Sequence, residues 1–242
     1  MDLEASRRRI ILALDGLGLD RSSKLVSQLG YQPGAYKIHD LWDVKGPGVV
    51  QGLQDAGPGL GSVSIFVDLK LKDIPNTVGL RAKAVRESGA RVLTVHASGG
   101  VEMMRAAVEH GPETILAVTV LTSLDEEEVH ILHGQPSKAA VLYQARLAKL
   151  AGVQGIVCSP QEVGILAKRS EFQTMKLVVP GIRQAGKEIA DQKRVDTPAA
   201  AIKAGATDLV IGRPITGAPD PVEAFEAIAE EIAAAMAEKQ TT

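Results

Sequence analysis

The sequence predicts an α/β protein built as one domain. Eight short runs rich in Val, Ile and Leu recur along the chain, and most segments between them have helix-like patterns. No linker divides the 242 residues. Because eight strands alternating with helices is the number that closes a parallel barrel, we predict a (β/α)8 TIM barrel that spans residues 1–242.

The predicted strands are IILALD (10–15), AYKIHD (35–40), SIFVDLKL (64–71), RVLTVHAS (91–98), TILAVTVL (114–121), GIVCS (155–159), KLVVPGI (176–182) and DLVIGRPI (208–215). A doubly wound open sheet is the alternative arrangement of such units. It is disfavoured because the first turn, LDGLGLDRS, lacks the third glycine of a dinucleotide-binding turn.

The segments between the strands predict helices at 77–90, 100–111, 137–152 and 198–206, each with a glycine near its C-terminal end. The Gly- and Pro-rich segment 46–62 predicts a short helix with loops. An Ala-rich amphipathic helix at 221–239 should close the fold and pack on its core. The arginines at 7–9 are expected to form a solvated turn before the first strand.

Composition excludes several classes of protein. A net charge of −2 gives no reason to expect nucleic acid or an anionic membrane as a partner. No apolar run approaches the roughly 18 residues of a membrane helix. The single cysteine, Cys158, cannot form an intrachain disulfide, and we expect an inert core thiol in a cytoplasmic protein.

Polar side chains stand at the C-terminal ends of seven predicted strands, where the active site of such a barrel lies. They are Asp15, residues 37–40, Asp68, Lys70, His96, Ser98, Thr122, Ser123, Arg183 and Arg213. Scattered surface polarity does not explain this distribution, so the sequence predicts a site at this end of the barrel.

The third strand, in the segment FVDLKLKDIPNT at 66–77, carries the strongest signal. Side chains alternate along a strand, so Phe66, Asp68 and Lys70 should share one face. Pro75 should end the strand and leave Asp73 in the outgoing loop. A lysine held between two carboxylates should have a raised pKa and remain a cation able to stabilise and protonate a carbanion. A structural ion-pair network is the alternative.

The last two strands end in VVPGIR and LVIGRPIT, which suggests a phosphate site. Gly212 would let a phosphate approach the backbone, and Arg213 offers a two-pronged donor. The polar segment RQAGKEIADQKRV suits a lid.

The motifs LALD, FVDLKLKDIPNTV, LTVHASGG, VTVLTS, VPGIR, DQKRV and IGRPIT, found in this order along nearly the whole chain, resemble the orotidine 5′-phosphate decarboxylase family. The resemblance implies decarboxylation of orotidine 5′-monophosphate to UMP and CO2, the last step of de novo UMP biosynthesis, with no cofactor and no metal. It implies a homodimer with shared active sites.

The resemblance also implies residue roles. Asp68, Lys70 and Asp73 match the charged network, with Lys70 as proton donor to C6 of the pyrimidine. Lys37 matches a second lysine that contacts the ribose and pairs with the aspartates. Asp73 and Thr77 match residues that reach the neighbouring subunit's site. Further matches are Asp15 to the ribose, Thr122 or Ser123 near the pyrimidine, and Arg183, Gln192, Gly212 and Arg213 on the phosphate side.

Two other functions stay open. One is a magnesium-dependent sugar-phosphate decarboxylase or aldolase-like enzyme, which shares the D-x-K-x-x-D strand. The other is a non-catalytic sensor of nucleotide phosphates, against which the intact charged strand argues. His130 and His133 could suggest a metal pair, but their spacing beside a run of glutamates is more typical of a solvated helix face.

Overall fold

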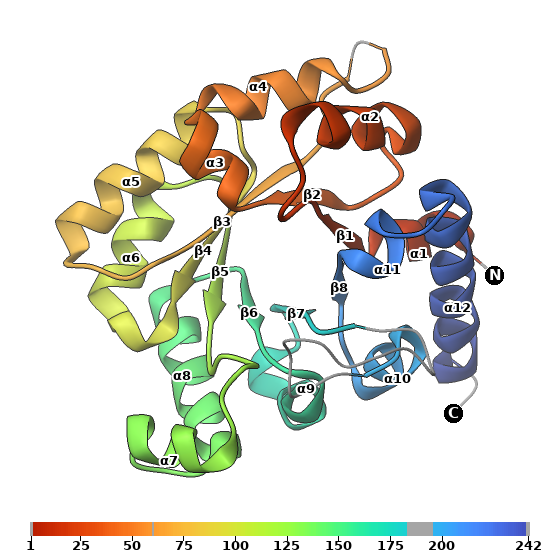
Figure 1. The fold of residues 1–242 in the computed structure, drawn as a ribbon. Helices are drawn as coiled ribbons and strands as arrows, with labels where there is room; N and C mark the ends of the chain where they lie inside the picture. The colour runs from red at the N-terminus through yellow and green to blue at the C-terminus, as the bar shows by residue number, and fades with distance from the viewer. Residues whose placement is uncertain (1, 60, 183–195, 241–242) are drawn as a thin grey trace.

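The chain folds into a closed barrel of eight parallel strands surrounded by helices, seen end-on in Figure 1. The computed structural model describes residues 2–59, 61–182 and 196–240. The strands are β1 (Ile10–Ala13), β2 (Ala35–Ile38), β3 (Ile65–Leu71), β4 (Val92–His96), β5 (Thr114–Val118), β6 (Gly155–Val157), β7 (Lys176–Val179) and β8 (Asp208–Ile211). Ile11 of β1 pairs with Val210 of β8, which closes the sheet. The predicted TIM barrel is therefore confirmed, and the open sheet is excluded.

The α-helices of the described residues lie around the barrel or at its ends. They are α1 (Leu3–Arg8), α2 (Leu19–Leu29), α3 (Asp40–Lys45), α4 (Gly48–Asp55), α5 (Pro75–Glu87), α6 (Val101–His110), α7 (Glu126–His133), α8 (Ser137–Ala151), α9 (Pro160–Ala167), α10 (Pro198–Ala204), α11 (Arg213–Thr216) and α12 (Pro221–Gln240). The short helix predicted within 46–62 is α4, and the predicted closing helix is α12.

The solvated turn expected at residues 7–9 is wrong, because residues 3–8 form helix α1. The side chain of Asp2 accepts a hydrogen bond from the N–H of Ala5 at 2.9 Å and so caps the first turn. Arg7 then pairs with Glu226 of α12 at 2.7 Å. This contact spans the two ends of the chain, and Figure 1 shows α1 beside α12.

Local sequence signals account for several helix ends. Gly152 and Gly205 cap α8 and α10 with φ values of 81° and 116°, a conformation that only glycine adopts at little cost. At α7, Asp125 accepts from the N–H of Glu128, whose carboxylate accepts from the N–H of Asp125 in return.

Two apolar cores lie on either side of the sheet. The larger one packs the outer faces of the strands against the helices. The smaller one fills the barrel itself with Ile11, Ala35, Phe66, Leu116 and Val178. This inner core fills the barrel below its mouth, so the polar side chains at the C-terminal ends of the strands lie above an apolar floor.

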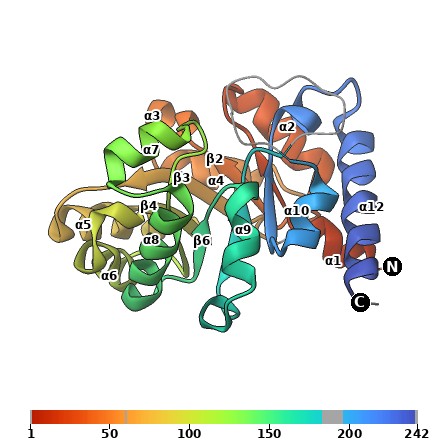
Figure 2. The same ribbon diagram turned by 90° about the horizontal axis from the view of Figure 1, so that it is seen from below.

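The C-terminal ends of the strands form one end of the barrel. Helices α3 and α7, which follow β2 and β5, lie at this end, as Figure 2 shows from the side. Among the described residues, no helix is both long and apolar enough to cross a membrane.

Candidate active site

A cavity of about 440 Å³ opens at the C-terminal ends of the strands. This volume is within the range of small-molecule sites. Seven of the residues predicted from the sequence line it, namely Asp15, Lys37, Asp68, Lys70, Thr122, Gly212 and Arg213. They come from five different strands or the loops that follow them, so barrel closure brings together residues up to 198 positions apart, Asp15 and Arg213.

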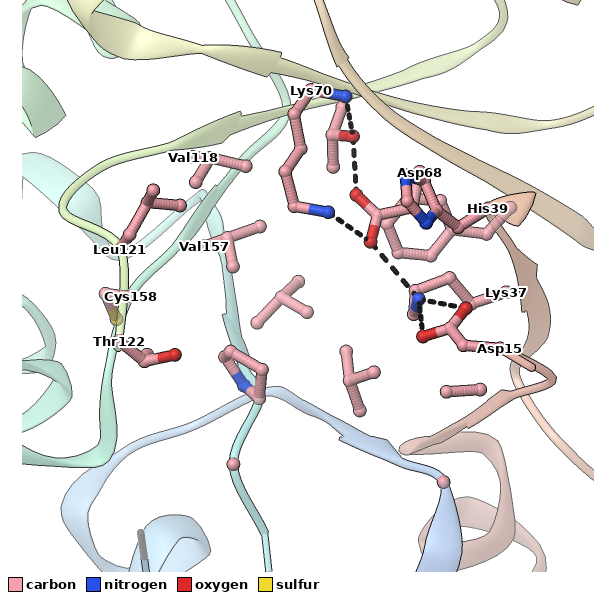
Figure 3. A pocket seen from close by; sticks show the side chains of 18 of the residues that line it. Asp15, Lys37, His39, Asp68, Lys70, Val118, Leu121, Thr122, Val157 and Cys158 are labelled. Atoms are coloured by element: carbon pink, nitrogen blue, oxygen red, sulfur yellow. Dashed lines mark hydrogen bonds and ion pairs between the residues drawn. The ribbon is translucent and has the colours of Figure 1, made fainter. Parts of the chain in front are cut away.

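The carboxylate of Asp68 is the centre of a charged chain across the cavity wall, shown in Figure 3. Its Oδ2 lies 2.9 Å from the Nζ of Lys70 and 3.2 Å from the Nζ of Lys37. The Nζ of Lys37 also contacts both oxygens of Asp15, at 2.6 and 2.7 Å. Two cations therefore share one carboxylate, and a second carboxylate stabilises one of them.

Burial makes this arrangement depend on its internal pairing. Burial by itself raises the pKa of Asp68, but the ammonium groups of Lys37 and Lys70 outweigh it and lower that pKa to about 2. Burial likewise lowers the pKa of Lys37, and the carboxylates of Asp68 and Asp15 more than reverse this, so the pKa is raised overall. Both groups are consequently charged at neutral pH.

One electrostatic detail differs from the sequence expectation. Within one chain, the lysine held between two carboxylates is Lys37, and no ion pair joins Lys70 to Asp73 in the described ranges. The Lys70 side chain is 37% exposed and reaches into the cavity, whereas the Lys37 side chain is 7% exposed. Lys70 is thus the lysine available to a ligand.

The predicted alternation along β3 is confirmed. Phe66, Asp68 and Lys70 line the cavity, while Val67 and Leu71 belong to the outer core. The strand is nevertheless irregular, because its pairing with β4 shifts register between Val67 and Leu71. Within this bulge Lys70 has a φ of 48°, the left-handed region that residues with a side chain seldom occupy.

An apolar surface completes the cavity opposite the charges. Val118, Val120 and Val157 line it, together with Pro180. Figure 3 shows Val118 and Val157 on the side of Lys70 that faces away from Asp15. The site is thus polar on one side and apolar on the other, which suits a heterocycle whose charge lies at one edge.

Several predicted residues do not line this cavity. Asp73 lies in the loop after β3, as predicted, and is exposed, with Oδ1 accepting the N–H of Ile74 at 2.7 Å. Thr77, in the first turn of α5, and Ser123 are also absent from the lining. Arg183 and Gln192 lie outside the described residues, as does the predicted lid.

Two residues beside the charges were given no role by the sequence. His39 lines the cavity after β2. Thr94, in the middle of β4, is buried and donates to Asp68 through its hydroxyl. In the sequence, Thr94 is an ordinary strand residue within LTVHAS. Alternation along the strand could have placed it on the inner face, because it lies two residues before His96. His96 itself is not part of the lining.

In α7, His130 is exposed, as expected of a solvated helix face, whereas His133 is half-buried and lies 3.3 Å from the amide of Gln144. In the described part of the chain, no group of three or more His, Cys, Asp or Glu side chains could hold a metal ion. Cys158 is a free, buried thiol, and burial together with nearby Glu162 raises its pKa. It is therefore protonated and unreactive at neutral pH.

Comparison with known proteins identifies the family. The sequence model described as "Orotidine 5'-phosphate decarboxylase / HUMPS family" matches residues 8–228. The orotidine 5′-phosphate decarboxylase of Anaeromyxobacter dehalogenans is 45% identical over 225 residues, which cover 91% of this chain and 96% of the relative. That of Thermobifida fusca is 44% identical over 227 residues, 92% of this chain and 95% of the relative.

A solved structure agrees with the sequence relatives. The crystal structure of orotidine 5′-phosphate decarboxylase from Lactobacillus acidophilus superposes with a TM-score of 0.73 at 33% identity, covering 93% of this chain and 99% of that one. Both the sequence and the fold therefore agree over nearly the whole length, and the chain belongs to the orotidine 5′-phosphate decarboxylase / HUMPS family.

Proposed function

We propose that this chain decarboxylates orotidine 5′-monophosphate to UMP and CO2 without a cofactor, and that Lys70 stabilises and protonates the carbanion at C6. The observation that carries the proposal is the Asp68 carboxylate shared between Lys37 and Lys70 at the mouth of the barrel. The names of the curated relatives support the same substrate.

The chemistry places a specific demand on the site. When the bond between C6 and the carboxylate breaks, its electron pair stays on C6 in an orbital that no neighbouring carbonyl can delocalise. A fixed cation beside C6 stabilises this charge electrostatically. The Lys70 ammonium then transfers a proton to C6, forming the C–H bond of UMP, and the neutral amine regains a proton from water.

Asp68 and the apolar wall have complementary parts in this proposal. Asp68 is ionised and tied to two lysines, so it holds the Lys70 ammonium in place and presents negative charge near the substrate carboxylate. Val118 and Val157 offer an apolar surface across the cavity. Released CO2 is uncharged and is compatible with such a surface, whereas the carboxylate is not.

We assign the phosphate to the opposite side of the cavity, at Gly212 and Arg213. Both line the cavity after β8. A Cβ at position 212 would meet nothing closer than 3.4 Å, the Cβ of Ala13, so protein packing leaves room beside this backbone. Arg213 offers two parallel N–H donors that match a phosphate. Arg183 and Gln192 remain predictions for the same group.

The proposal includes a homodimer in the cytoplasm, in which Asp73 and Thr77 act in the neighbour's cavity. Neither lines the cavity of its own chain. Ile74 and Leu80, which flank Thr77, are 65% and 63% exposed, and such apolar side chains favour contact with a second copy. The buried, free thiol of Cys158 suits a reducing compartment.

The deciding experiment is to incubate the protein with orotidine 5′-monophosphate in excess EDTA and follow the loss of the orotate absorbance. Undiminished formation of UMP is expected. Activity that is lost with EDTA and restored by Mg²⁺ would contradict the proposal and favour the magnesium-dependent enzyme. Tight binding of UMP without any turnover would favour the nucleotide sensor.

A further inference from the structure

Thr94 lies in β4, directly opposite the irregular part of β3. Its side chain is 1% exposed and lies opposite the bulge in β3. In the pairing of β3 with β4, Val67 is opposite Leu93 and Leu71 is opposite Val95. Four residue steps on β3 therefore face two on β4, with Thr94 at the centre of the shorter side.

The hydroxyl of Thr94 makes two hydrogen bonds, and both lead to catalytic groups. It accepts the backbone N–H of Lys70 at 2.9 Å and donates to Oδ1 of Asp68 at 2.7 Å. A bulge removes a residue from the regular ladder, so its N–H needs another acceptor. The Lys70 N–H finds that acceptor in a side chain, where the backbone has turned to a φ of 48°.

The second bond fixes the orientation of the carboxylate. With Oδ1 bound to Thr94, the other oxygen of Asp68 points to the Nζ atoms of Lys70 and Lys37. One hydroxyl thus controls both ends of Lys70: its backbone directly, and its ammonium group through Asp68. A group that is held at both ends keeps its charge at a constant position, which electrostatic catalysis requires.

We propose that Thr94 is a positioning residue for the decarboxylation, whose hydroxyl holds the strained backbone of Lys70 and the Asp68 carboxylate in the geometry that places the Lys70 ammonium at C6. This inference rests on the proposed function. Thr94 also lines the cavity, but its hydroxyl is bonded to Lys70 and Asp68, so we assign it a positioning role and not a catalytic one.

The chain offers a matched control one strand away. Thr119 follows β5, is also buried, and donates its hydroxyl to the backbone carbonyl of Val157 at 2.9 Å. It does not line the cavity. Thr119→Val therefore removes the same kind of buried hydroxyl near the same end of the barrel without touching Lys70 or Asp68.

The test compares turnover for two pairs of side chains at position 94, Thr with Val and Ser with Ala, whose members differ chiefly in the hydroxyl. Thr94→Val should lower kcat by about 10- to 100-fold, because a hydrogen bond to a charged group is lost, while KM changes by less than about threefold, because the phosphate contacts are unaffected. Thr94→Ser should keep kcat near the wild-type value, and Thr94→Ala should lose it. Thr119→Val should keep it.

A binding measurement separates positioning from general damage to the fold. UMP has no charge at C6, whereas 6-hydroxyuridine 5′-monophosphate carries an anionic oxygen there. Thr94→Val should weaken binding of the anionic analogue by at least about tenfold, with UMP affinity within about threefold of wild type.

Three results would overturn the inference. The first is a kcat of Thr94→Val equal to that of Thr119→Val, and the second is an equal loss of kcat in Thr94→Ser and Thr94→Ala. The third is an equal loss of affinity for UMP and for the anionic analogue in Thr94→Val. If Thr94→Val does not fold, the Ser and Ala pair decides the question. The wild-type protein in the same assay tests the proposed function separately. If the wild type does not decarboxylate orotidine 5′-monophosphate, the proposed function is wrong, whereas the variants at position 94 test only the role of Thr94.

Discussion

At the scale of single residues, the site depends on pairing more than on any one charge. Asp68 is 7% exposed and would be costly to ionise alone, yet two lysines keep it charged. Lys37 is 6% exposed and is kept charged in turn by Asp15 and Asp68. Removing one member therefore leaves a buried charge without its partner, which is why a neutral replacement should cost stability as well as activity.

The pH dependence of stability tests this pairing. The pKa of Asp68 falls from 3.8 to about 2 in the folded chain, so its ionised form contributes stability that is fully present above about pH 4 and lost as pH falls towards 2. The shift corresponds to about 2 kcal/mol. Asp68→Asn should thus lower the unfolding free energy by at least about 2 kcal/mol at pH 7, measured by urea denaturation.

The difference between wild type and Asp68→Asn should stay constant from about pH 5 to 8 and shrink below about pH 4. Asp43→Asn, on the exposed surface of α3, is the control and should change stability by less than about 0.5 kcal/mol. A difference that is independent of pH down to about pH 2 would contradict the lowered pKa of Asp68.

At the scale of elements, two irregular segments carry the site. Strand β3 is interrupted by a bulge at Lys70. The chain after β8 turns at Gly212 into the single-turn helix α11, whose end is tied to α2 by a hydrogen bond of 2.6 Å from Arg21 to the carbonyl of Thr216. The regular parts of β3 and β8 lead to the cavity. The bulge in β3 and the turn after β8 then set the direction of the side chains of Lys70 and Arg213.

The proposed division of the cavity predicts how α11 contributes to binding. Arg213→Ala should weaken UMP binding by about 10- to 100-fold, because a charge-assisted contact with the phosphate is lost. Binding of uridine, which has no phosphate, should change by less than about twofold. Isothermal titration calorimetry measures both.

Arg91→Ala provides the matched control for Arg213→Ala. Arg91 is exposed and lines a second cavity of about 270 Å³, which shares only Val178 with the candidate site, so neither ligand should be affected. If Arg213→Ala weakened UMP and uridine equally, Arg213 would act on the nucleoside or on the fold, and the phosphate would have to bind elsewhere.

At the scale of the whole molecule, seven predicted site residues line the cavity of one chain, and the proposed homodimer would use Asp73 and Thr77 in the cavity of the second copy. Both lie outside the cavity of their own chain. The shared-site dimer makes a prediction that no single-chain site can satisfy, namely that two inactive variants restore each other.

Mixing Lys70→Ala and Asp73→Ala chains tests this prediction. In a mixed dimer one site carries both changes, while the other has Lys70 from one chain and Asp73 from its neighbour and is intact. Random pairing should recover about a quarter of wild-type activity from two nearly inactive proteins. The measurement is turnover after the mixture has been unfolded and refolded together.

The control for this mixing experiment is a pair of variants with the change in the same half of the site, Lys70→Ala and Asp68→Ala. Every mixed dimer then lacks an intact site, and no activity should return. Failure of the first mixture to recover activity, with mixed dimers demonstrated by a size tag, would show that Asp73 serves its own chain.

Much of this protein could be predicted from its sequence alone, because the signals are local. The eight strands follow from apolar runs, and alternation along β3 places Asp68 and Lys70 on the inner face. Pro75 begins α5, as its fixed φ favours, but β3 already ends at Leu71, before the loop that holds Asp73. These features depend on backbone sterics and on the two-residue period of a strand, both of which operate over a few residues.

Only the tertiary structure decided which side chains meet. That Lys37, rather than Lys70, lies between two carboxylates of its own chain depends on the pairing of β1, β2 and β3. The role of Thr94 depends on a register shift between β3 and β4, and the position of α1 beside α12 depends on a contact between the two ends of the chain. Register and closure are set by packing between segments far apart in sequence, so no local pattern encodes them.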